Sequence, residues 1–245
     1  MRDSKLSICR DLADLSRKAA EEFVRLANQV VSEKDCFTVA LSGGSTPKEL
    51  YSLLAAPEFA ERIPWPKVHL FWGDERCVSP DHPESNYRMV KETLLSKVPI
   101  PEKNVHRMRG EEDPQIAARN YEQTLRKFFA LTEGEFPRLD LVLLGLGRDG
   151  HMASLFPGSA ALHPTNRLVA AVASAPPQPS RLTLTLPVIN RAAHIIFLVA
   201  GKDKALALRD ALGAETDPVR FPSQSIKPEN GKLTWLVDQD AASLL

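Results

Sequence analysis

Apolar residues recur every three or four positions near the start of the chain. Between residues 11 and 31 this spacing puts six of them on one face, namely Leu12, Leu15, Ala19, Phe23, Leu26 and Val30. A period near 3.6 residues is typical of an amphipathic helix that buries one face. The pattern therefore predicts a helix over 11–31.

Shorter runs rich in β-branched, leucine and aromatic residues follow, separated by further helical segments. They predict strands at 36–41, 68–72, 139–144, 167–173, 181–186, 194–200 and 233–237, and helices at 48–54, 85–95, 114–131 and 202–212. Such alternation is typical of a mainly parallel sheet with helices on both faces. We therefore expect an α/β protein. No internal repeat, low-complexity linker or domain boundary is evident in the chain.

Composition and charge narrow the class of partner. The 245 residues are 43% hydrophobic and 25% charged, which is ordinary for a soluble globular protein. Basic and acidic residues both number 31, so the formal net charge is zero, and no long basic block is present. These features argue against nucleic acid and anionic membranes. We expect a small-molecule ligand, and an anionic one would need a local cluster of cations and backbone N–H groups.

The cysteines and the apolar runs bear on the compartment. Cys9, Cys36 and Cys77 are odd in number and lack metal-ligand spacing, as is usual for reduced thiols. The N-terminal segment has no apolar core of signal-peptide length, and the longest apolar runs, such as 195–200, are too short to cross a bilayer. We therefore expect a cytoplasmic protein.

The segment SGGSTP at 42–47 directly follows a predicted strand. Gly43 and Gly44 permit close backbone approach, Ser45 and Thr46 carry hydroxyls, and Pro47 is suited to the first turn of a helix. Free N–H groups at such a helix start attract anions. The segment is thus a candidate phosphate-binding loop, and a plain strand-to-helix turn with a Ser or Thr cap fits it about as well.

A second charged segment, GDER at 73–76, also follows a strand. Asp74 and Glu75 could hold hydroxyls or act as acid or base, and Arg76 could bind a phosphate. The alternative is a cluster of surface ion pairs without a function.

The third such segment, GLGRDGH at 145–151, contains the most informative histidine. Its glycines leave Asp149 and His151 as the groups there that are suited to proton transfer near neutral pH. A carboxylate can fix the tautomer of a catalytic imidazole, although spacing does not reveal whether Asp149 does so. A flexible turn with an incidental histidine is the alternative.

All three segments follow strands of one predicted parallel sheet, so we expect them to meet at its carboxyl edge, where such sheets bind ligands. None of the six histidines forms an HxH, HxxxH or HExxH pattern, and we predict no metal site. The GxSxG motif of serine hydrolases is also missing. Water activated by His151 is the chemistry that remains.

With a fourth segment, RLTLTLPVIN, these stretches resemble the 6-phosphogluconolactonase family, within the superfamily that also contains glucosamine-6-phosphate isomerases. The segments that carry the resemblance are SGGSTPKELY, FWGDERCVSPDHPESNYRM and LDLVLLGLGRDGHMASLFPGS. The resemblance covers nearly the whole chain. It implies a Rossmann-like, three-layer α/β/α fold, with residues 1–245 as one domain. It also implies cofactor-free hydrolysis of 6-phospho-D-glucono-1,5-lactone in the oxidative pentose phosphate pathway, and we expect a monomer.

The resemblance also implies roles for individual residues. His151 would be the general base, with Asp149 and Asp74 as polar partners and Glu75 as a lesser candidate. The remaining candidates would bind substrate or phosphate, or support the site: Gly43, Gly44, Ser45, Thr46, Arg76, Asn86, Arg88, Gly147, Gly150, Arg181 and Lys204.

Two other functions stay open. In glucosamine-6-phosphate isomerases the loop resembles GNDGHIAFNEP, with a carboxylate five residues after the histidine and an aromatic residue after Asp-Glu. This chain has Phe156 and Arg76 at those positions, which favours the lactonase. A silent sugar-phosphate-binding protein would not need both Asp149 and His151. The loop 175–180 lacks the lysine expected in many lactonases, so the phosphate contacts stay open.

Overall fold

The computed structural model describes residues 4–163 and 165–245. Its main element is a seven-stranded sheet in which every neighbouring pair of strands is parallel. From one edge to the other the strands are β1 (Ser4–Cys9), β10 (Lys232–Asp238), β9 (His194–Val199), β6 (Leu141–Leu144), β2 (Phe37–Leu41), β3 (Val68–Trp72) and β5 (Val105–His106).

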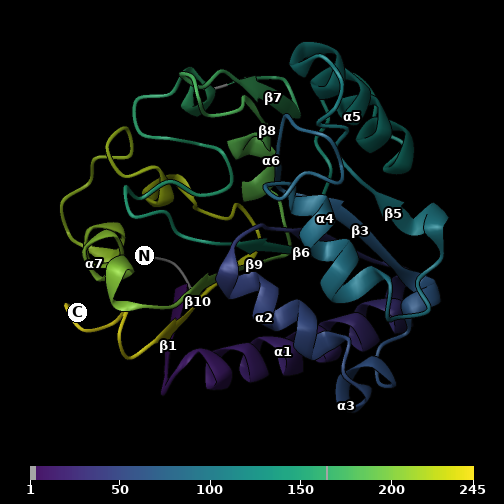
Figure 1. Cartoon of the computed structure of the whole chain (residues 1–245), viewed down its shortest axis with the longest axis horizontal. Helices are drawn as coiled ribbons and strands as arrows, with labels where there is room; N and C mark the ends of the chain where they lie inside the picture. Colours follow the sequence, from purple (N-terminus) through teal and green to yellow (C-terminus); the bar gives the residue numbers. More distant parts are fainter. Residues whose placement is uncertain (1–3, 164) are drawn as a thin grey trace.

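Helices cover both faces of this sheet, as Figure 1 shows. In that view α1 (Leu12–Lys34) and α2 (Ser45–Leu54) lie below the sheet, whereas α5 (Pro114–Phe128) and α6 (Leu186–Asn190) lie above it. The other helices are α3 (Pro57–Ala60), α4 (Asn86–Val90) and α7 (Ala205–Leu212). The predicted α/β class with a mainly parallel sheet is therefore confirmed.

The centre of the sheet is dry because its strands are apolar on both faces. All residues of β2 and β6 are buried, as expected for strands between two helical layers. Helix α1 adds Leu15, Phe23 and Leu26 to this core, and Asp11 caps its start by accepting the N–H of Asp14.

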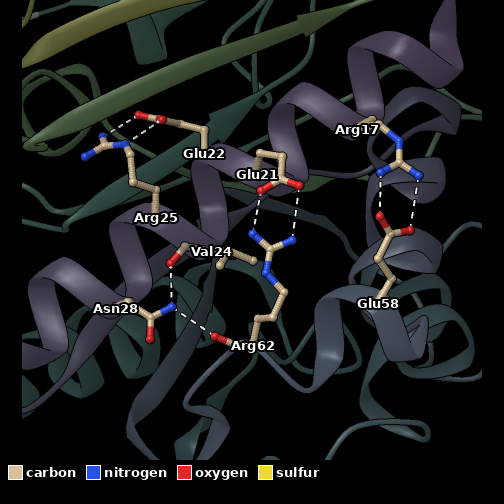
Figure 2. Close-up of polar contacts among 8 residues, drawn as sticks. All are labelled: Arg17, Glu21, Glu22, Val24, Arg25, Asn28, Glu58 and Arg62. Carbon is tan, nitrogen blue, oxygen red and sulfur yellow. Dashed lines mark hydrogen bonds and ion pairs between the residues drawn. The ribbon is translucent and has the colours of Figure 1, made fainter.

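Ion pairs attach the segment 57–62, which contains α3, to the outer surface of α1, as shown in Figure 2. Arg17 binds Glu58 and Arg62 binds Glu21, each through two hydrogen bonds. Both guanidinium groups also lie over the buried ring of Phe59. These charges are solvated, so they fix the position of α3 more than they stabilise the fold.

The segment 73–76 forms a strand that sequence periodicity did not predict. β4 (Asp74–Arg76) pairs antiparallel with β8 (Arg181–Leu184), which pairs antiparallel with β7 (Val169–Val172) in a separate small sheet. Gly73 leads directly into it, accepting the N–H of Leu184 at 2.8 Å. A three-residue strand of charged residues is too short and too polar to give a hydrophobic pattern.

Several other element boundaries differ from the prediction. Strand β1 was not predicted. It is a short edge strand whose Leu6 and Ile8 side chains are exposed, so its apolar positions do not mark a buried face. The predicted strand 181–186 ends at Leu184, because α6 begins two residues later with a proline in its first turn. The predicted helix 85–95 is α4 followed by a π-helical turn, Lys91–Leu95.

Strand order creates a switch point between β2 and β6. From β2 the chain proceeds to β3 and β5 on one side, and β6, β9 and β10 then extend the sheet on the other side. The loops after β2 and β6 diverge there, which opens a crevice at the carboxyl edge.

None of the helices in the described part of the chain combines the length and the apolar character that a membrane span requires.

Candidate active site

A pocket of about 190 Å³ lies at this switch point. Its walls come from the segments that follow β2, β3, β6 and β9, together with α4 and β8. Of the fifteen predicted site residues, eleven line it: Gly43, Gly44, Ser45, Thr46, Asp74, Arg76, Asn86, Gly147, His151, Arg181 and Lys204. The predicted convergence of the three loops at one edge is thus observed.

The loop after β2 presents backbone to the pocket. Gly44 has φ of 104°, a conformation that glycine adopts easily, and it caps α2 without a side-chain hydrogen bond. Because no side chain caps α2, the first N–H groups of the helix stay available to a ligand. Gly43 packs so closely against the amide of Asn86 that a Cβ atom would overlap it.

The loop after β6 holds a histidine–carboxylate pair. Nδ1 of His151 lies 2.5 Å from Oδ1 of Asp149, and the His151 N–H donates to the same oxygen at 3.2 Å. Burial opposes ionisation of Asp149, but the charge and hydrogen bonds of His151 outweigh it, so the pKa of that carboxyl is below its ordinary value. An ionised partner makes Nδ1 the protonated nitrogen, which leaves Nε2 as the acceptor.

Glycines allow this pair to form. A Cβ atom on Gly147 would overlap the His151 ring and come within 2.6 Å of Asp149 Oδ1. Gly150 has φ of 82° and packs against Phe221. Gly150 and Asp149 do not line the pocket themselves. Asp149 lies against His151 Nδ1 away from the pocket lining, and Gly150 lies in the turn with a positive φ.

Asp74 is buried on the pocket wall, at 6% exposure, with defined hydrogen-bond partners. Its Oδ1 accepts from Asn86 Nδ2 at 3.2 Å, and its Oδ2 accepts from Ser154 Oγ at 2.8 Å. Asn86 Nδ2 also donates to the Asp74 carbonyl at 2.9 Å. The carboxylate is therefore oriented by two segments distant from it in sequence.

Glu75 points away from the pocket, into the start of α4. It accepts the N–H groups of Arg76, Asn86 and Tyr87 and the hydroxyl of Ser85. Burial raises the pKa of Glu75 despite these backbone donors. Its position fits a structural cap of α4, with no surface toward a ligand.

Two arginines face the pocket side by side. Arg76 and Arg181 are register partners in the small sheet, and Nε of each is buried without a hydrogen-bond partner among the described residues. Burial, followed by the charge of Arg76, lowers the pKa of Arg181. Adjacent guanidinium groups with unused donors suit a multiply charged anion.

The remaining candidate cations differ in position. Lys204 lines the pocket from the turn before α7, and its Nζ lies 3.6 Å from Oδ2 of Asp203. Arg88 does not line it. Its guanidinium binds Glu92 at 2.7 Å and the Asp81 carbonyl at 2.9 Å, so its donors are directed elsewhere.

Ser154 and Ser42 were not predicted. Ser42 lines the pocket with a buried, unpartnered Oγ, and its place at the start of SGGSTP could have identified it. Ser154 contacts Asp74 across 80 residues, which no local signal reveals. Among residues 4–163 and 165–245, no group of three or more His, Cys, Asp or Glu side chains is arranged to hold a metal.

A parallel sheet with a histidine–carboxylate pair and two arginines at its switch point defines a Rossmann-like α/β protein with a pocket suited to a small anion. A family model described as "Glucosamine-6-phosphate isomerases/6-phosphogluconolactonase" matches residues 10–235. The chain belongs to this family.

Individual relatives are similar over nearly their full lengths. A 6-phosphogluconolactonase from Synechocystis sp. is 48% identical over 218 residues, covering 89% of this chain and 88% of the relative. One from Nostoc sp. is 42% identical over 241 residues, covering 98% of both chains. The solved structure of 6-phosphogluconolactonase from Trypanosoma brucei has a TM-score of 0.87 at 28% identity, covering 99% of this chain and 98% of that one.

Proposed function

We propose that this chain is a 6-phosphogluconolactonase, which hydrolyses 6-phospho-D-glucono-1,5-lactone to 6-phospho-D-gluconate in the oxidative pentose phosphate pathway. The observation that carries the proposal is the His151–Asp149 pair, whose imidazole lines a pocket together with Arg76 and Arg181. This combination joins a neutral-pH base to a phosphate site, as the reaction requires. The names of the relatives support it.

Arg76 and Arg181 bind the phosphate of the substrate in this proposal. Their unused Nε donors and their shared position favour a dianion, and Lys204 adds charge from the wall beyond β9. Asp74 and Asn86 are close enough to the pocket to accept from and donate to sugar hydroxyls. The lactone carbonyl then lies toward His151 and the glycine loop.

His151 activates water. Nε2 takes a proton as the water oxygen bonds to the lactone carbonyl carbon, whose own oxygen becomes an oxyanion. Backbone N–H groups or a cation can stabilise that charge. When the tetrahedral intermediate collapses, the bond from this carbon to the ring oxygen breaks, and the ring oxygen takes the proton back from His151. The new carboxylic acid then ionises and releases one proton. No cofactor takes part.

The experiment is proton release at constant pH from fresh 6-phosphogluconolactone. We expect the protein to accelerate it well above the spontaneous rate, and an unchanged rate would refute the proposal. His151→Ala should lower kcat by about 10²- to 10⁴-fold, the usual contribution of a general base, without weakening inhibition by inorganic phosphate. The exposed His163 provides the control variant, His163→Ala, with normal turnover.

Isomerisation of an amino-sugar phosphate is the second candidate, because the same family includes it. Phe156, which packs on His151, disfavours it, since ring opening by a carboxylate at that position is impossible here. Turnover of glucosamine-6-phosphate in place of the lactone would favour this alternative.

We also propose that the protein is a cytoplasmic monomer that acts as one domain. The free thiols of Cys9, Cys36 and Cys77 support a reducing compartment, and one chain supplies all the pocket residues named above. Light scattering of the purified protein tests the monomer, and a mass of two chains would contradict it.

A further inference from the structure

The turn after His151 has an uncommon backbone conformation. Ala153 has φ of 47°, in the left-handed region that residues with a Cβ rarely adopt. The turn is closed by a bridge between Met152 and Leu155, with the Leu155 N–H donating to the Met152 carbonyl at 3.0 Å. Such conformations persist only where surrounding contacts require them, and they concentrate at functional sites.

This turn places the side chain of Ser154 against a carboxylate. Ser154 is fully buried, and its Oγ donates to Oδ2 of Asp74 at 2.8 Å. Its N–H donates to Oγ1 of Thr183 at 3.3 Å, and Thr183 is the register partner of Asp74. Ser154 is thereby held against both strands of the β4–β8 pair.

The turn therefore presents its residues to two places. His151, Met152 and Ala153 line the pocket, whereas Ser154 reaches behind the wall to the carboxylate. Asn86 holds the other oxygen of that carboxylate and itself packs on Gly43. One chain of contacts thus connects the histidine turn, β4, α4 and the loop after β2.

We infer that Ser154 is a positioning residue for substrate binding, which fixes the Asp74 carboxylate toward the sugar hydroxyls and sets its place relative to His151. A hydroxyl that donates to a carboxylate forms a strong, directional bond, and it leaves the other lone pairs of that oxygen for a ligand. The inference rests on the proposed function for the identity of the sugar.

Ser154→Ala should lower kcat/KM for 6-phosphogluconolactone by about tenfold to a hundredfold, the range implied by losing a hydrogen bond to a charged group. Calorimetry should show 6-phosphogluconate bound about tenfold or more weakly, with inorganic phosphate bound as by the wild type, because the arginines are untouched. Ser159→Ala is the matched control in the same segment, since Ser159 Oγ accepts from the N–H of Ala161.

A double-mutant cycle separates positioning from general damage. In an Asp74→Asn background, Ser154→Ala should lower kcat/KM little further, because Ser154 acts through the Asp74 carboxylate, which that background lacks. Ser154→Cys keeps the size and a weak donor, so an intermediate loss is expected even if the alanine variant folds poorly.

Equal losses of Ser154→Ala in both backgrounds, or equal weakening of phosphate and phosphogluconate, would overturn the inference. So would unchanged affinity for phosphogluconate. An inactive wild type would instead contradict the proposed function, and the calorimetric comparison would still test Ser154.

Discussion

The phenyl ring of Phe156 lies 4.5 Å from the imidazole of His151, centroid to centroid, with an interplanar angle of 43°. The guanidinium of Arg181 lies 5.9 Å from the centroid of the same phenyl ring. One aromatic side chain therefore contacts both the candidate base and a candidate phosphate ligand. It occupies the position at which the isomerases have a carboxylate.

Phe156→Leu should reduce kcat by about three- to tenfold, because an aromatic pair contributes about 0.5–1.5 kcal/mol beyond its buried area. The His151 ring would then be less well fixed. Phe156→Tyr keeps the ring and should retain most of the activity. Phe136→Leu, at a ring that packs with Arg191 instead, is the control. Steady-state kinetics at saturating lactone measure the difference, and a wild-type kcat in the leucine variant would contradict the argument.

Arg76 and Arg88 should respond differently to substitution. Arg76→Ala should raise KM for the phosphorylated lactone by about tenfold to a hundredfold, since a charge-assisted hydrogen bond is lost. Arg88→Ala should change KM little, because Arg88 binds Glu92 and the Asp81 carbonyl outside the pocket.

Glucono-1,5-lactone without phosphate provides the control for this comparison. Arg76→Ala and the wild type should hydrolyse it equally, because the lost contact is to the phosphate. Similar KM changes for both arginine variants would contradict the assignment of the phosphate to Arg76.

Two glycines of the histidine loop form a second matched pair. A Cβ atom on Gly147 would overlap the His151 ring, whereas one on Gly145 meets no atom within 4 Å. Gly147→Ala should therefore displace His151 and lower kcat by about tenfold or more, since general-base catalysis depends on its placement. Gly145→Ala should lower kcat much less than Gly147→Ala does. Equal kcat values in the two variants would argue against the described packing.

Stability should depend on pH through a half-buried histidine pair. His69 Nδ1 lies 3.2 Å from His106 Nε2, and both rings pack against Phe128. Burial lowers the pKa of His106 to about 4, with a further contribution from His69. Burial and then Lys103 lower the pKa of His69.

As the pH falls, the two histidines take up protons in the unfolded chain before they do so in the folded protein, because folding lowers their pKa values. The stability that the neutral histidines contribute is therefore complete above the ordinary histidine pKa of 6.5 and is lost as the pH falls toward 4. We expect a loss of about 1–2 kcal/mol, discounted for partial solvent screening of His106. Urea unfolding at about pH 7.5 and about pH 5 measures it. In the His106→Leu variant, the free energy of unfolding should depend less on pH than in the wild type. In the variant of the exposed His163, His163→Leu, it should depend on pH as in the wild type. The reverse order would refute the assignment of this pH dependence to the His69–His106 pair.

Local patterns along the chain are enough to predict the central strands, the α/β class and the edge at which the site lies. Buried strands such as β2 and β6 and the amphipathic helix α1 have local periodicities that report which face is dry. The glycines beside His151 singled out Asp149 and His151 as the groups of that loop suited to proton transfer, and the packing of Gly147 against the His151 ring shows why a side chain is excluded there.

Which polar side chains share the pocket depends on how the elements pack together, and local patterns do not reveal it. Glu75 and Asp74 are adjacent in sequence, yet one caps α4 and the other lines the pocket, because successive residues of a strand point in opposite directions. The pairs Arg76–Arg181 and Asp74–Ser154 join segments far apart in the chain. Hydrophobic periodicity records burial along one element, whereas these partners depend on how separate elements pack against one another.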